Sequence, residues 1–149
     1  MRGLIVILIF ACLIQSTFLP INLVLMILII RSFIVDSKSN FYLAFIFGLV
    51  VSLLQGQIIG PISLINLFSI ALVSVLKKSQ IAQNLITLML VGVTLLTVDH
   101  IIESVIIQTS IDFKLVIYHI VIFIPVYLLV RFLEERFVVQ KEIKLKIKS

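Results

Sequence analysis

The chain has little that could cover a water-exposed surface or support covalent chemistry. Only 13% of its 149 residues are charged, tryptophan is absent and there is a single cysteine. An average soluble domain carries roughly 25% charged residues, so this chain has too little polar surface for one. Cys12 has no second cysteine to pair with, which excludes an intrachain disulfide and a cysteine-based metal site. A small buried hydrophobe is the simpler interpretation of Cys12.

Apolar residues dominate instead, at 62% of the chain with a mean hydropathy of +1.32. They form continuous segments near the lower end of the roughly 17–25 residues that a transmembrane helix needs, whereas the strands of a membrane barrel would alternate apolar and polar residues. We therefore predict an all-α, polytopic integral membrane protein with six transmembrane helices, the first retained rather than cleaved. The predicted segments are 3–19, 20–35, 41 to 55 or 58, 61–76, 83–98 and 114–132.

Proline, glycine and polar residues set the predicted breaks between these segments. Pro20 has no amide hydrogen and therefore suits the first turn of the second helix. Gly56 and Gly60 separate the third segment from the fourth. The fifth helix could continue as far as Gln108, but we expect it to emerge into water near Asp99.

The distribution of basic residues predicts the orientation in the membrane. With six crossings, eleven of the twelve Lys and Arg residues fall on one side, and Lys114 alone falls on the other. The positive-inside rule then places both termini in the cytoplasm. The expected organisation is a transmembrane domain at 1–135 and a basic cytoplasmic tail at 136–149, which can contact anionic membrane lipids.

Small residues recur every fourth position in the third segment, at Gly48, Ser52, Gly56 and Gly60. On one continuous helix they would form a stripe that lets another helix approach closely. Internal packing of the third helix against the fourth is the simpler interpretation, and binding of a partner helix is the more specific functional one. Gly56 and Gly60 also fit turns. Polar residues that could face the stripe and hydrogen-bond across the interface recur on the fourth segment: Ser63, Asn66 and Ser74.

Other charged residues have plain structural interpretations. Asp99, His100, Glu103 and His119 match no strong metal-ligand spacing, so we expect a solvated outer rim there. Arg31 is expected to reach the inner lipid headgroups. Because the chain has no phosphate-binding loop and no nucleophile or metalloprotease motif, we expect no catalytic residues, cofactor, metal or nucleic-acid partner.

Two stretches of the chain carry a family resemblance. The stretch at 44–67 contains Gly48, Leu49, Gly56 and Gly60. These residues match a pattern that reads approximately G-L-x-x-D, then apolar residues, a glycine and another glycine four further on. The chain thereby resembles the family of rod-shape-determining membrane proteins, MreD, although Ser52 stands where that family usually has Asp. The stretches are LIQSTFLP at 13–20 and AFIFGLVVSLLQGQIIGPISLINL at 44–67.

Resemblance to MreD implies a non-catalytic inner-membrane subunit of the bacterial cell-elongation complex. Such a subunit binds the bitopic protein MreC through helix packing. It helps to link MreB filaments to the peptidoglycan glycosyltransferase RodA and its transpeptidase partner, and so regulates cell shape. The residues expected to pack or to contact a partner are Gly48, Ser52, Gly56, Gly60 and Asn66.

An alternative function comes from proteins that are similar to MreD in architecture. The substrate-binding S components of energy-coupling-factor vitamin transporters also have six helices. They commonly carry an Ala-x-x-x-Ala pattern in an early helix, where this chain has Ala11 alone, and their pockets are expected to offer aromatic and polar groups. A small membrane protein with merely convergent glycines is the third possibility.

Overall fold

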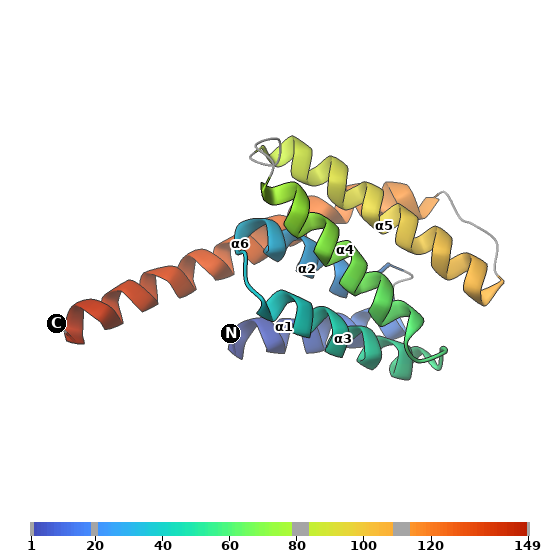
Figure 1. Ribbon diagram of the computed structural model, residues 1–149, viewed down its shortest axis with the longest axis horizontal. Helices are drawn as coiled ribbons and strands as arrows, with labels where there is room; N and C mark the ends of the chain where they lie inside the picture. Colours follow the sequence, from blue (N-terminus) through green and yellow to red (C-terminus); the bar gives the residue numbers. More distant parts are fainter. Residues whose placement is uncertain (1, 19–20, 79–83, 109–113, 149) are drawn as a thin grey trace.

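The computed structural model describes residues 2–18, 21–78, 84–108 and 114–148 (Figure 1). These residues form six α-helices and no β-strand, so the predicted all-α class is confirmed. The helices are α1 (Arg2–Thr17), α2 (Leu23–Ile34), α3 (Ser39–Gln55), α4 (Pro61–Lys78), α5 (Leu85–Ile107) and α6 (Lys114–Lys148).

The short helix α2 lies at the centre of the bundle and contacts each of the other five helices. Its sequence is apolar on every side, which is typical of a helix enclosed by protein. Every residue from Leu23 to Ser32 is accordingly buried. The helix begins after Asn22, whose side-chain oxygen accepts a hydrogen bond from the Leu25 amide at 3.0 Å.

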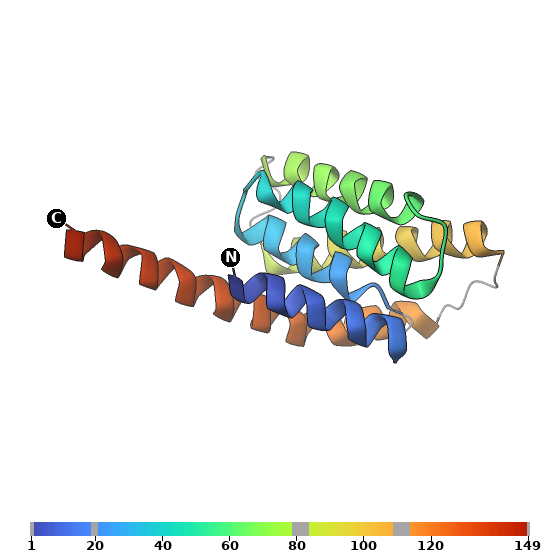
Figure 2. The same cartoon turned by 90° about the horizontal axis from the view of Figure 1, so that it is seen from below.

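The other helices pack around this centre. The most extensive helix–helix contact is between α3 and α4. Helix α1 packs on α2 and α3, whereas α6 packs on α2 and α5. Figures 1 and 2 show that the C-terminal part of α6 leaves the bundle and projects beyond the other helices.

The outer surface of the bundle is apolar. Phe18 is 82% exposed and Ile86 is 78% exposed, and large apolar side chains are exposed on five of the helices. By length and composition, two helical stretches are apolar enough to cross a membrane, Leu85–Ile106 in α5 and Lys114–Arg136 in α6. The apolar parts of α1 to α4 are shorter. Further examples of exposed apolar residues are Phe10, Tyr42, Phe68 and Phe132.

Three predicted boundaries differ from the structure by more than two residues. Helix α2 begins at Leu23, whereas Pro20 lies outside the described residues. The expectation that the fifth helix ends near Asp99 is wrong, because α5 continues to Ile107. The chain can remain helical there because Asp99 is buried and hydrogen-bonded inside the bundle. Helix α6 also passes the expected end near residue 132 and continues to Lys148.

Candidate functional site

The closest approach between two helix backbones in the predicted small-residue region occurs at Gly48. A Cβ atom added to Gly48 would lie 2.6 Å from the Cα atom of Ser63 and 3.1 Å from Nδ2 of Asn66. Carbon atoms in contact normally lie about 3.5–4.0 Å apart. Helices α3 and α4 can therefore pack at this distance only because residue 48 is glycine.

The polar residues around this contact are fully enclosed. Ser52 and Asn66 are 0% exposed, so neither can reach a partner outside the bundle. The Ser52 hydroxyl donates to the Gly48 carbonyl oxygen at 2.9 Å, within its own helix. Both polar side-chain atoms of Asn66 have no hydrogen-bond partner among the described residues. Of the two interpretations of these residues, the geometry supports packing inside the bundle.

The hydroxyl groups of Ser63 and Ser74 on α4 do not donate across the interface either. Ser63 Oγ donates to the carbonyl oxygen of Gly60 at 2.7 Å, and Ser74 Oγ donates to that of Ile70 at 2.9 Å. The expectation that these serines join α4 to α3 by hydrogen bonds is therefore wrong. Packing at Gly48, rather than hydroxyl bonding, brings the two helices together.

Gly56 and Gly60 do not continue the helical stripe. Helix α3 ends at Gln55, and Gly56 adopts a left-handed conformation with φ of 64°. The amide of Gln57 then donates to the Ser52 carbonyl oxygen at 3.0 Å, which is the bonding pattern of a Schellman C-cap. Gly60 also has a positive φ, of 117°. No neighbouring atom lies within 4 Å of a Cβ atom added to either glycine, so both serve the turn and the stripe interpretation is wrong for them.

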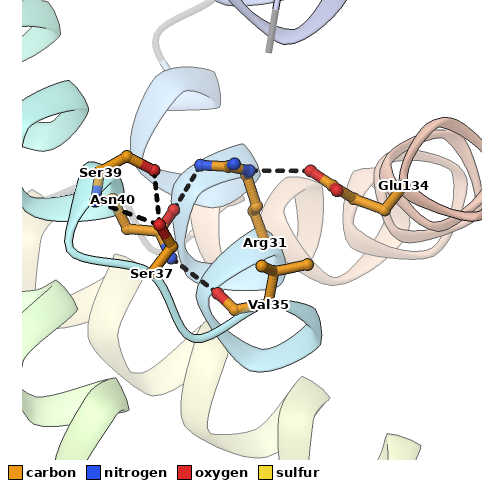
Figure 3. Close-up of polar contacts among 6 residues, drawn as sticks. All are labelled: Arg31, Val35, Ser37, Ser39, Asn40 and Glu134. Atoms are coloured by element: carbon orange, nitrogen blue, oxygen red, sulfur yellow. Dashed lines mark hydrogen bonds and ion pairs between the residues drawn. The ribbon is translucent and has the colours of Figure 1, made fainter. Parts of the chain in front are cut away.

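A second polar cluster, not expected from the sequence, joins α2, α3 and α6 around Arg31 (Figure 3). The Arg31 Nε atom donates to Glu134 Oε1 at 2.8 Å. Its Nη1 atom donates to Asn40 Oδ1. Asn40 in turn donates from Nδ2 to the Val35 carbonyl oxygen at 2.9 Å.

This arrangement corrects the expectation for Arg31. The residue is 4% exposed and Glu134 is 14% exposed at the side chain, so the guanidinium group does not reach lipid headgroups. A buried cation is tolerated only when it is paired and hydrogen-bonded, and Glu134 and Asn40 supply both. The Arg31 cluster, defined as Arg31, Asn40 and Glu134, therefore fixes three helices together.

A third polar contact lies toward the opposite end of α2. Asn22 donates from Nδ2 to Asp99 Oδ2 at 2.9 Å, and both residues are buried. The Asn22 side chain thus caps α2 and also binds α5. The Asp99 carboxylate is not part of a solvated rim, because it faces the inside of the bundle.

Glu103 and His119, which were also expected in the outer rim, differ in their hydrogen bonding. Glu103 accepts a hydrogen bond at Oε1 from Gln57 Nε2 at 3.1 Å. His119 on α6 is buried, and its Nδ1 atom has no partner among the described residues. In the described part of the chain no three His, Cys, Asp or Glu side chains are grouped as they would be around a metal ion.

Sequence reasoning missed several residues that hold the bundle together. Gly92 is one: a Cβ atom there would lie 2.4 Å from Cε2 of Phe123, which is fully buried. A lone glycine within an apolar helix was the available signal. Asn40 and Glu134 carry no such signal, because their importance arises from the position of Arg31 on another helix.

Comparison with known proteins gives no assignment, since the chain matches no protein-family model, no curated protein and no solved structure.

Proposed function

We propose that the chain is a polytopic membrane protein whose six helices all enter the bilayer, with the C-terminal part of α6 projecting from it. The arrangement of polar and apolar side chains carries this proposal. Large apolar side chains cover the outside, whereas Arg31, Asn40 and Asp99 are buried. Polar groups in membrane bundles face the interior and pair there, while such an apolar exterior in water would favour aggregation.

Short helices are compatible with this proposal. At 1.5 Å per residue, the 12 residues of α2 extend only about 18 Å, less than the roughly 30 Å of the hydrocarbon core. Chain outside a helix is tolerated at membrane depth where protein covers it. The buried Asn22 side chain and the surrounding helices provide that cover at the start of α2.

Single-cysteine labelling tests the six-crossing topology. In a Cys12→Ala background, Lys38→Cys lies between α2 and α3 and Ile58→Cys lies between α3 and α4, and both positions are exposed. We expect an impermeant maleimide to label Ile58→Cys in intact cells, and to label Lys38→Cys only after the membrane is opened. Labelling of Lys38→Cys from outside would refute the cytoplasmic placement of both termini.

For the biochemical role, we propose a non-catalytic scaffold of the MreD type in the bacterial cell-elongation complex. The resemblance at Gly48, Leu49, Gly56 and Gly60 supports it, as does a helical bundle tied together by buried polar contacts. In this role the bundle binds an MreC-like single-pass protein. It helps to connect MreB with RodA and the transpeptidase partner of RodA.

Co-purification from a mild detergent tests this role. We expect an affinity-tagged chain to recover a single-pass protein with a large periplasmic domain, and an unrelated tagged polytopic protein to recover none. Because Gly48 and Asn66 are enclosed, the partner must bind the outer apolar surface. Recovery of an ATPase module instead would replace the scaffold role with that of a transporter S component.

A further inference from the structure

An apolar groove of about 640 Å³ lies between α4 and α5. Its walls run from Leu64 to Leu76 on α4 and from Ile102 back to Leu90 on α5, so the two helices line it in antiparallel order (Figure 1). Twelve residues of helix rise about 18 Å. This length is close to the roughly 15 Å depth of one leaflet, half of a hydrocarbon core of about 30 Å.

One end of the groove adjoins a more polar pocket of about 360 Å³, and Ile65 lines both cavities. The pocket lies where α3 ends and α4 begins, beside α5. Its polar lining includes Glu103, Gln57 and Gln55. The Oε1 atom of Gln55 is buried and has no hydrogen-bond partner among the described residues. The pocket therefore offers an unused acceptor next to a carboxylate.

The charge at this end of the groove is negative. Asp99 lines the groove and Glu103 lines the pocket, one helical turn further along α5. Each carboxylate accepts one bond from a neutral amide, Asn22 or Gln57. Within the described ranges, neither forms an ion pair with a cation. The negative charge available to a ligand is therefore that of Glu103 in the pocket, and it favours a ligand with a positive group.

Partial positive charge lies beside the same pocket, at the N-terminus of α4. Pro61 and Ile62 line the pocket, and Pro61 is the first residue of α4. A helix N-terminus carries partial positive charge and unpaired amides that favour an anion such as phosphate. The two charges are therefore arranged for a zwitterion rather than for a cation alone.

We propose that the groove and pocket together bind one phospholipid with a primary ammonium headgroup, such as phosphatidylethanolamine. An acyl chain lies along the groove between α4 and α5. The ammonium group donates to Glu103 and to Gln55 Oε1, while the phosphate lies at the start of α4. This inference rests on the membrane location proposed above and is independent of the scaffold role.

Native mass spectrometry of the detergent-purified full chain tests the proposal. Phosphatidylethanolamine, phosphatidylcholine and phosphatidylglycerol with identical acyl chains are added separately and the lipid adducts are compared. We expect phosphatidylethanolamine to bind best, because the choline headgroup has no N–H donor and the glycerol headgroup has no cation. Glu103→Gln should weaken phosphatidylethanolamine binding roughly tenfold, as loss of one charge-assisted hydrogen bond predicts. It should weaken phosphatidylcholine binding less, because choline loses only the charge attraction and no hydrogen bond.

Two further variants separate the groove from the headgroup pocket. Thr94→Phe fills the groove and should lower the adducts of all three lipids, whereas Val105→Phe adds the same bulk on α5 outside the groove and should lower none. Asp36→Asn removes an exposed carboxylate between α2 and α3, at the other end of the bundle, and is the charge control.

Three outcomes would overturn the proposal. They are equal binding of the three lipids, an unchanged lipid preference in Glu103→Gln, and binding of free ethanolamine as tightly as the lipid. The last would show that the groove contributes nothing. Absence of the chain from the membrane fraction would instead refute the membrane location itself, so the two failures are distinguishable.

Discussion

Replacement of Gly48 tests most directly how α3 and α4 are held together. In Gly48→Ala the new Cβ atom would lie 2.6 Å from Ser63 Cα and 2.9 Å from Ser63 Cβ. Normal contact needs about 3.5–4.0 Å, so the helices must separate by about 1 Å. The nearest atom belongs to the backbone, and rotation of a side chain cannot remove the clash.

The expected magnitude follows from two opposing effects. Alanine is favoured over glycine inside a helix by about 1 kcal/mol, whereas an overpacked interface costs about 1–3 kcal/mol. We expect Gly48→Ala to lower the free energy of unfolding by about 1 kcal/mol. Gly48→Leu adds three more carbon atoms at the same point and should lower it by about 3 kcal/mol or more.

The assay is reversible unfolding by sodium dodecyl sulfate in mixed micelles, followed by circular dichroism at the helical band. Leu53→Phe is the matched control, because it adds bulk to the same helix at a position that is 63% exposed. It should change the free energy by less than about 0.5 kcal/mol. A Gly48→Leu protein as stable as the wild type would refute the close packing of α3 on α4.

Two further substitutions test the other internal contacts. Glu134→Ala leaves the buried Arg31 cation without its ion-pair partner and should cost about 3–5 kcal/mol in the same unfolding assay, while Arg31→Met combined with Glu134→Leu should recover most of that loss. Gly92→Ala places a Cβ atom against the buried Phe123 ring and should cost about 1–3 kcal/mol, of which Phe123→Leu should restore part because the obstacle is a side chain.

The Glu134 experiment has a matched control on the same helix. The exposed pair of Arg131 and Glu135, 2.7 Å apart on α6, should lose at most about 1 kcal/mol when Glu135 becomes Ala. If Glu134→Ala is as mild as Glu135→Ala, the Arg31 cluster does not stabilise the bundle. If Phe123→Leu gives no recovery in Gly92→Ala, the clash with the ring is not the cause of the loss.

The sequence was sufficient for the features that depend on neighbouring residues. Continuous apolar segments separated by glycine, proline and polar residues predicted six helices close to their observed places, because helix formation and turn chemistry are local. The close approach of the third and fourth helices was one of two interpretations of the small-residue stripe, and the structure places that approach at Gly48. The sequence did not decide whether Gly56 belongs to a helical stripe or to a turn, because glycine suits both conformations.

Only the tertiary structure decided what the polar residues do. Arg31 and Asp99 were expected at the membrane surface, because an isolated charged side chain is costly inside a bilayer. Their partners, Glu134 and Asn22, are 103 and 77 residues away in the chain, and no local pattern reveals such a pair. Continuous apolar segments therefore determined that this chain forms a helical bundle. The packing of distant helices determined which charges could be buried, since burial is tolerated only where a partner is within hydrogen-bond distance.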